Sequence, residues 1–448
     1  MLTGGHAQDR FAVGFLLEVT DLSEDPEAVT TSQRPLARSL VLIMATATGL
    51  AVANNYYAQP LLPEISKDLH LSGAVAGLIV TVAQIGYALG LVFLLPLGDL
   101  RDRRKLLVVM SLVLAVALGV LAAAPTAGVL LPAAVAVGAL SVQAQILVPF
   151  AATLASDEER GRVVGTVMSG LLLGILLART VAGLVAQAGS WRIVYVAAAA
   201  AMLVQGATLA AKLPTVRLGT ALSYPGLLRS VLDLARQEPL LRLRSAYGAM
   251  SFGAFSVLWT SMAFLLAGSP YHYGPATIGL FGLVGATGAA MASIAGRLAD
   301  RGYGPKVTIA TALVLVVSWL PILLGRHHIG WLIVGILLLD IGAQGLHITN
   351  QSEIYKLQPE ARSRITSAYM TTYFIGGAVG SASSAAAWDA GGWSAVCAVG
   401  VAFCVIAVAI WATVGRRFDR PRAAATGRYG VDGRRSDAIE AAEPVRHG

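Results

Sequence analysis

The chain has 448 residues, of which 56% are hydrophobic and 13% are charged. A soluble domain carries roughly 25% charged residues, so this composition excludes an ordinary soluble protein and indicates an integral membrane protein. The formal charge of +8 and the pI near 9.6 could suggest nucleic-acid binding, but the basic residues alternate with loop number and therefore report membrane topology.

Twelve apolar stretches come close to or exceed the ~20 residues that a helix needs to cross a bilayer. The predicted spans are roughly 39–60, 73–97, 105–124, 127–151, 163–188, 193–213, 243–267, 275–295, 306–325, 330–352, 364–388 and 392–414. Arginine and lysine cluster in the even-numbered loops, which places these loops and both termini in the cytoplasm by the positive-inside rule. We expect residues 1–38 to form a flexible cytoplasmic arm and residues 415–448 to form a disordered cytoplasmic tail.

The chain divides into two similar halves. A polar linker at 214–242 separates a bundle at 39–213 from a bundle at 243–414. The pattern Gly-x-Leu-x-Asp-Arg at residues 98–103 recurs at 296–301, an offset of 198, and an offset of 202 carries Trp191 onto Trp393 and Gln145 onto His347. The repeat predicts an all-α membrane fold of twelve helices in two pseudo-symmetric six-helix bundles. Such folds place a substrate site between the halves near mid-membrane, so the repeat already suggests transport.

A charged motif follows the second span and returns after the eighth. Glycine permits close backbone approach, aspartate accepts hydrogen bonds from a helix N-terminus, and arginine pairs with carboxylates or phosphates. A latch that holds one conformation fits these residue types. Its candidate residues are Gly98, Asp102, Arg103, Gly296, Asp300 and Arg301.

On these two motifs, residues 35–415 resemble the major facilitator superfamily. Asn54-Asn-Tyr-Tyr-Ala-Gln-Pro60 in the first span looks more narrowly like the bacterial drug and metabolite proton antiporters of the arabinose-efflux-like branch. This resemblance implies proton-driven export of a small molecule across the bacterial inner membrane. The fifth span departs from the antiporter pattern, because Gly170-x-x-x-Gly174 is followed by Ile175 and not by a Gly-Pro pair. Uptake or facilitated exchange of a sugar or organic acid is therefore the alternative.

One polar stripe marks the predicted pathway. Asp340, Gln344, His347 and Gln351 are spaced 4, 3 and 4 apart and fall within about 60° of arc on the tenth span. A buried carboxylate favours its protonated form and a nearby cation favours the charged form, so Asp340 is the proposed proton-coupling residue. His347 titrates near neutrality and is the proposed relay. The alternatives are a permanent ion pair for Asp340 and a packing role for His347.

Arg179 lies deep in the fifth span. A charge near mid-bilayer costs at least ~2.5–3.5 kcal/mol, so such residues usually face a protein interior or a wet cavity. We expect Arg179 to share proton coupling by pairing with Asp340 across the two halves, or else to bind an anionic group of the substrate directly.

The expected substrate contacts are polar or aromatic residues of six spans. In the first span we assign Asn54 and Tyr57 to the cavity and treat Tyr56 as an interfacial anchor. Each of these residues could instead be part of the packed core. The other candidates are Gln84, Gln143, Gln145, Trp259, Gln344, Tyr369 and Tyr373.

Other classes of function find little support in the sequence. It contains no metal-spaced His/Glu set, no nucleophile elbow and no phosphate loop, so we expect no enzyme, no metal and no cofactor. A receptor would be expected to carry an appended folded domain, and none is visible. The expected partners are a small-molecule substrate, protons and the lipid bilayer, without nucleic acid, and the protein is expected to be a monomer.

Overall fold

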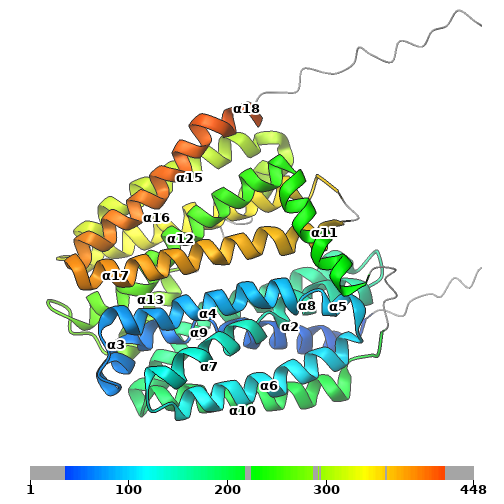
Figure 1. The fold of residues 1–448 in the computed structure, drawn as a ribbon, viewed down its shortest axis with the longest axis horizontal. Helices are drawn as coiled ribbons and strands as arrows, with labels where there is room; N and C mark the ends of the chain where they lie inside the picture. The colour runs from blue at the N-terminus through cyan, green and yellow to red at the C-terminus, as the bar shows by residue number, and fades with distance from the viewer. Residues whose placement is uncertain (1–35, 217–222, 286–290, 292–293, 359–360, 419–448) are drawn as a thin grey trace, which may run out of the picture.

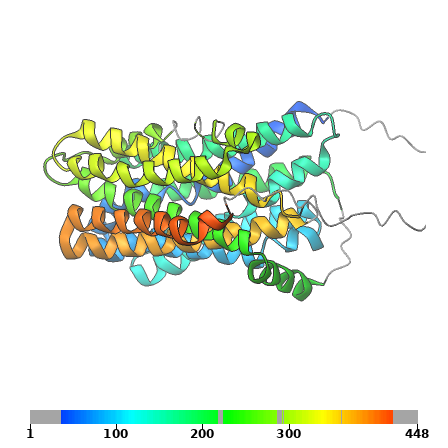
Figure 2. The same cartoon turned by 90° about the horizontal axis from the view of Figure 1, so that it is seen from above.

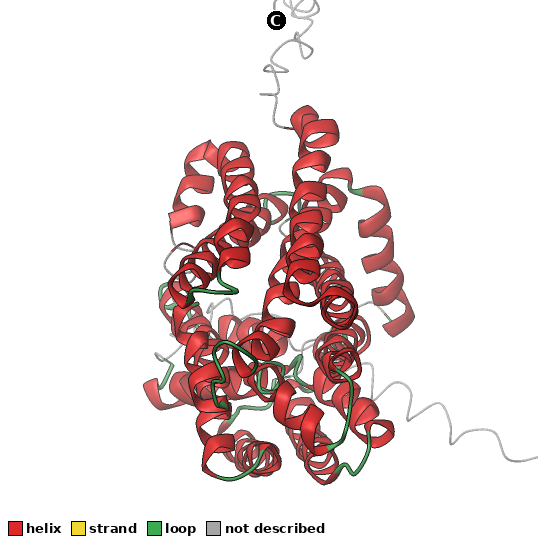
Figure 3. Cartoon of the chain, turned by 90° about the vertical axis from the view of Figure 1, so that its left-hand side faces the viewer, coloured by secondary structure: helices red, strands yellow, loops and turns green. Residues whose placement is uncertain are grey.

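The computed structural model describes residues 36–216, 223–285, 291, 294–358 and 361–418, and these residues form helices joined by short loops, without a strand. The helices form two bundles, one above the other in Figure 1. Seen from the end in Figure 3, they again form an upper and a lower group.

The N-terminal half contains six crossings, three of which are broken into two shorter helices each. Its helices are α2 (Arg38–Ala53), α3 (Ala58–Asp68), α4 (Gly73–Phe93), α5 (Leu97–Leu100), α6 (Arg103–Ala123), α7 (Ala127–Leu140), α8 (Gln143–Leu154), α9 (Arg160–Ala188) and α10 (Trp191–Lys212). The first crossing breaks between α2 and α3, where residues 54–57 form a turn. Pro60 lacks an N–H, so the carbonyl four residues earlier, inside this turn, cannot receive the usual helical bond.

The C-terminal half repeats this plan. The linker forms α11 (Tyr224–Gln237), and the helices that follow are α12 (Pro239–Ala267), α13 (Pro275–Val284), η1 (Ala299–Tyr303), α15 (Gly304–Leu324), α16 (Ile329–Ile354), α17 (Arg362–Ile410), η3 (Trp411–Gly415) and α18 (Arg416–Phe418). The long α17 holds two crossings, because Gly392 adopts a φ of 62° and turns the chain back. Ten described helices are long and apolar enough to cross a membrane; counting α17 as two crossings and adding the crossing that begins with the shorter α13 gives the predicted twelve.

Large apolar side chains cover the outside of the molecule. Val116 on α6, Val204 on α10 and Leu320 on α15 are each more than 60% exposed. An apolar surface of this extent is unusual in a soluble monomer and suits contact with lipid. The confirmed fold is thus an all-α, twelve-helix membrane protein.

The two ends of the molecule are easily told apart. We call the end that carries α11 the linker end and the end that carries the loops 69–72 and 268–274 the far end; they lie at the right and the left of Figure 1. Figure 2 shows the same crossings from above, running between these two ends.

The halves meet along two helix pairs, α4 with α17 and α9 with α13. A Cβ added at Gly77 would lie 2.5 Å from the Cβ of Ala385, and one added at Gly183 would lie 3.1 Å from the Cα of Gly279. Only small residues allow this approach of two helices. An offset of 202 carries Gly77 onto Gly279 and Gly183 onto Ala385, so the two interfaces are equivalent positions of the repeat.

Candidate functional site

Arg179 is buried between the halves, with 3% of its surface exposed. Its Nε donates a hydrogen bond of 2.6 Å to Oε1 of Gln59 on α3. The guanidinium carbon lies 3.9 Å from the ring centre of Trp259 on α12, 4.8 Å from Tyr56 and 5.8 Å from Phe255. Cations are attracted to aromatic faces at these distances. One terminal nitrogen of the guanidinium, Nη2, is buried without a hydrogen-bond partner.

Asp340 on α16 is equally buried, and its Oδ1 has no hydrogen-bond partner. A Cβ added at Gly285 would lie 2.6 Å from Oδ2 of Asp340, and one added at Gly282 would lie 2.9 Å from Cβ of Arg179. Arg179 therefore packs against Gly282 at the end of α13, and Asp340 packs against Gly285 in the turn that follows, three residues later in the chain. No ion pair within 4.0 Å joins them among the residues described. The structure thus brings the predicted partners to one interface, but without direct contact in this conformation.

An aromatic ladder leads from Arg179 toward His347. The ring of Phe255 lies 5.7 Å from that of Phe252, which stacks on Tyr373 at 4.1 Å. Tyr373 lies 4.6 Å from the imidazole of His347, whose Nδ1 is 3.0 Å from the hydroxyl of Tyr369. The predicted residues His347, Tyr369 and Tyr373 therefore form one cluster. Gln344, one turn from Asp340 on the same helix, is half-buried.

The expected orientation of the first crossing is corrected by the structure. Nδ2 of Asn54 donates to the backbone carbonyls of Leu50 and Ala51 and approaches the sulfur of Met202 on α10, while Tyr57 packs in the apolar core of its own half. Tyr56 is only 8% exposed and faces Arg179, so it is not an interfacial anchor. The turn at 54–57 shifts the helical register.

The three candidate glutamines lie in different environments. Gln143 belongs to the interior of the N-terminal half, because its Oε1 accepts hydrogen bonds from Ser111 on α6 and Gln205 on α10; its predicted place in the pathway is corrected. Gln145 donates to the hydroxyl of Tyr87, which stacks on Phe374 of the other half. Gln84 on α4 donates to Ser256 on α12 and so joins the two halves.

The first copy of the loop motif makes its contacts within its own half. Arg103 donates to the carbonyl of Gly98, to Oγ1 of Thr153 and to Oδ1 of Asp99 at 3.1 Å, and Oδ1 of Asp102 caps α6 by accepting from the N–H of Arg104.

In the second copy, Gly296 packs near Ile348, and Arg301 is exposed. The side chain of Asp300 lies outside the described part of the chain. The role of both copies as a latch stays a prediction.

The charged centre breaks the symmetry of the repeat. An offset of 202 carries Arg179 onto Ser381 and carries Gly138 onto Asp340. The hydroxyl of Ser381 donates to the carbonyl of Gly77. Gly138 packs closely on the backbone of Ala83, because an added Cβ would lie 1.9 Å from the carbonyl oxygen of Ala83. Only the α9–α13 interface therefore carries buried charge, while the α4–α17 interface is neutral at the corresponding positions.

Sequence reasoning missed two residues beside Arg179, Gln59 and Tyr56, and a third, Arg244, which lies near the start of α12, about 22 Å along that helix from Trp259. Gln59 and Tyr56 are three residues apart in the motif at 54–60 and so share one helix face, but the face expected to line the cavity was a different one, that of Asn54 and Tyr57. Arg244 is 3% exposed and donates to Oγ1 of Thr308 at 2.7 Å. It stands next to the predicted start of the seventh span, where basic residues normally mark the membrane boundary.

Two small cavities lie near Arg179. One is lined by Arg179, Gln59, Trp259 and neighbouring apolar residues, and the other lies among α3, α12 and α13 beside Glu64 and Lys67. Both cavities are lined by Pro60 and Ile278, which thus stand between the buried arginine and Glu64.

Two duplicated helical bundles that enclose opposite charges at their interface define a membrane transporter. The family model of the Major Facilitator Superfamily matches residues 44–381 and 245–443, and the chain belongs to this family. It is 49% identical over 396 residues to the putative uncharacterized transporter YgaY of Escherichia coli K12, covering 88% of this chain and all of that protein. It is 35% identical to the probable transporter SCO4007 of Streptomyces coelicolor, covering 83% and 86% of the two chains.

Solved structures show the same fold. A bacterial homologue of the human lysosomal transporter Spinster, in an inward-facing and unoccupied conformation, matches with a TM-score of 0.71 and 14% identity, over 86% of this chain and 98% of that one. The nucleoside transporter NupG matches with a TM-score of 0.68 and 13% identity, over 83% and 99%. The predicted membership of the superfamily is confirmed.

Proposed function

We propose that this transporter exports a small organic molecule, a drug or a metabolite, by proton antiport through alternating access. The observation that carries the proposal is the pair of buried, opposite charges at one interface, Arg179 from the N-terminal half and Asp340 from the C-terminal half, each with an unsatisfied polar atom. Buried charges without full compensation are costly, so such residues in a membrane helix usually mark a pathway.

The proton acts on this interface through Asp340. When the carboxylate is charged, its attraction to the guanidinium of Arg179 holds α16 and α9 toward the shared helix α13. Protonation removes that attraction and allows the halves to move apart. A substrate group that donates to Oδ1 of Asp340 competes with the proton for the same carboxylate, and by linkage each then weakens the binding of the other, as antiport requires.

The cluster at His347 supplies a second proton-binding group. The imidazole lies beside the hydroxyl of Tyr369 and the ring of Tyr373, and the aromatic ladder connects it to Arg179. We place the relay here and the substrate contacts along the ladder, at Trp259, Tyr373 and Gln344. In this proposal both termini are cytoplasmic, the protein is a monomer of the bacterial inner membrane, and the linker end faces the cytoplasm.

The decisive test is transport in inside-out vesicles with an imposed pH gradient and a panel of cationic, neutral and anionic compounds. Antiport predicts accumulation that follows the gradient and collapses with it. It also predicts that Asp340→Asn removes the dependence on the gradient, whereas Asp389→Asn, an acid at the far end, keeps it. Accumulation that ignores the gradient would refute proton coupling.

A second function rests on the unpartnered Nη2 of Arg179. An organic acid could bind this nitrogen, and its negative charge would weaken the hold of Arg179 on the charged form of Asp340. Proton and anion would then bind together, which gives uptake or cotransport. The same vesicle panel separates the two functions, because anions would move with the proton and not against it.

A further inference from the structure

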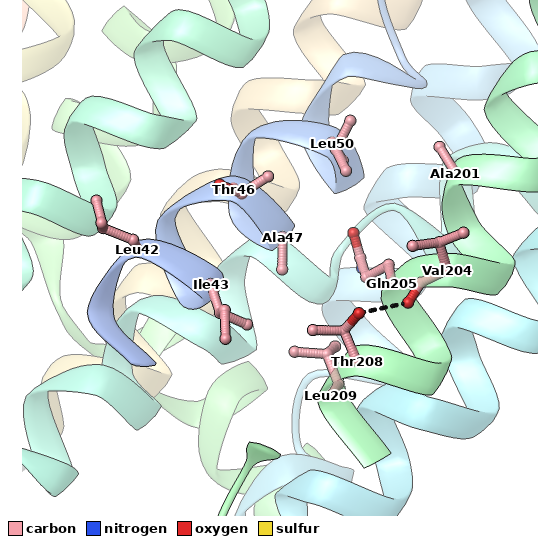
Figure 4. A pocket seen from close by; sticks show the side chains of 10 residues that line it. All are labelled: Leu42, Ile43, Thr46, Ala47, Leu50, Ala201, Val204, Gln205, Thr208 and Leu209. Carbon is pink, nitrogen blue, oxygen red and sulfur yellow. Dashed lines mark hydrogen bonds between the residues drawn. The ribbon is translucent and has the colours of Figure 1, made fainter. Parts of the chain in front are cut away.

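A groove opens between α2 and α10 on the lipid-facing side of the N-terminal half, and it shares no lining residue with the cavity at Arg179. Its volume is about 400 Å³, within the roughly 300–1,000 Å³ of ligand pockets. The lining residues are uncharged and mostly apolar, and Figure 4 shows them on the two facing helices. They are Leu42, Ile43, Thr46, Ala47, Leu50, Ala201, Val204, Gln205, Thr208 and Leu209.

The duplicated fold does not require this groove. Gly174 packs on Gly49 as Gly376 packs on Ala249, which relates α2 to α12 by an offset of 200. The offset of 202 between Trp191 and Trp393 relates α10 to the second crossing of α17. These offsets carry Ala47 onto Tyr247 and Ala201 onto Phe403.

Tyr247 and Phe403 are both buried in one apolar cluster of the C-terminal half. Two large rings therefore stand where the N-terminal half has two alanines. The N-terminal half keeps open a space that its repeat fills, so the groove follows from the choice of side chains and not from the architecture.

Two exposed cations stand at the linker end of the groove. Arg38 is the first residue of α2 and Lys212 is the last residue of α10, and neither makes an ion pair with a described residue. Arg38 is four residues from Leu42, and Lys212 is four from Thr208, so each lies on the same helix face as the groove lining, about 6 Å beyond it. Their exact counterparts in the repeat are Glu238 and Val414, whereas the cations of the other half stand at neighbouring positions, Arg242 and Arg416.

We propose that the groove and its two cations form a binding site for an anionic phospholipid. One acyl chain lies between α2 and α10, along eight residues of each helix or about 12 Å, and the phosphate lies between Arg38 and Lys212. The uncharged lining matches the acyl chain, and the paired cations match the headgroup, as basic residues at the cytoplasmic side of membrane helices match anionic lipids. The site does not depend on the proposed antiport.

The test uses the full-length protein in phosphatidylcholine nanodiscs that contain a trace of phosphatidylglycerol with a diazirine in its acyl chain. After irradiation, mass spectrometry maps the crosslinked peptides. We expect crosslinks concentrated on residues 42–50 and 201–209, and at least about fivefold weaker labelling by a phosphatidylcholine probe with the same chains, since each basic residue near the surface contributes on that order.

Two variants test the two parts of the site separately. Arg38→Gln with Lys212→Gln should lower phosphatidylglycerol labelling to the level of the phosphatidylcholine probe. Arg417→Gln, which removes an exposed cation of the other half, should leave it unchanged. Ala201→Phe, which copies the residue of the repeat, should remove labelling of the groove while both cations remain.

Three results would overturn the proposal. They are crosslinks spread evenly around the lipid-facing surface, equal labelling by the two probes, and labelling that survives both the loss of the cations and the filling of the groove. Because the double charge variant changes only exposed side chains, it keeps the test valid if Ala201→Phe fails to fold.

Discussion

Gly183→Ala should force the two halves apart at the α9–α13 interface. A Cβ at this position would lie 2.2 Å from the carbonyl oxygen of Pro275 and 3.1 Å from the Cα of Gly279. A carbon and a carbonyl oxygen in contact are separated by about 3.3 Å or more, so the helices must separate by roughly 1 Å. That movement stretches the 3.1 Å hydrogen bond from Thr180 to the carbonyl of Gly279.

Overpacking of this kind costs about 1–3 kcal/mol, which corresponds to roughly a five- to 150-fold shift in a two-state equilibrium. The shift should favour conformations in which the far end is open. The measurement is the distance between nitroxides at Lys67 and Arg326, two exposed far-end positions in different halves, by pulsed electron resonance. The buried Cys397 and Cys404 are replaced by alanine in all samples.

Gly165→Ala is the matched control, because a Cβ at this position of the same helix would meet nothing within 4 Å. We expect the control to keep the wild-type distance distribution and Gly183→Ala to increase the longer component. Identical distributions for all three proteins would show that this close approach does not set the balance between conformations, and the reasoning from the glycine contacts would fail.

Three further predictions concern buried polar groups. Asp340→Asn should lower the thermal stability, because it leaves the charge of Arg179 uncompensated, and the additional change Arg179→Gln should restore part of the lost stability. A double variant less stable than Asp340→Asn alone would contradict a shared electrostatic site. Gln59→Leu should cost about 1.5–3 kcal/mol, since it removes a charge-assisted bond to a buried guanidinium, and unchanged unfolding would refute that bond. Gln143→Leu should destabilise the protein but leave the KM for substrate unchanged, because the hydrogen-bond partners of Gln143 lie inside one half. A changed KM with normal stability would instead indicate that Gln143 contacts the substrate pathway.

The two interfaces between the halves are equivalent in the repeat but differ in charge. Both interfaces between the halves use small residues, glycine or alanine, at corresponding positions, which keeps the two helix pairs close. Arg179 and Asp340 stand where the other interface has serine and glycine. The duplication thus gives two equivalent interfaces between the halves. In our proposal, a proton or a substrate changes the charge at one of them, the α9–α13 interface.

The sequence by itself determined the class of protein, the helical crossings, the duplication and the buried charges, because hydrophobic length, charge position and repeated spacing are properties of the linear chain. It also singled out Asp340, His347, Tyr369 and Tyr373, since a regular helix presents residues at fixed intervals. The tertiary structure alone decided which face of the first crossing reaches Arg179, because the turn at 54–57 interrupts the helical period. It also decided that Gln143 packs inward and that an open groove lies beside α2, because these depend on how neighbouring helices fill space, which no single helix encodes.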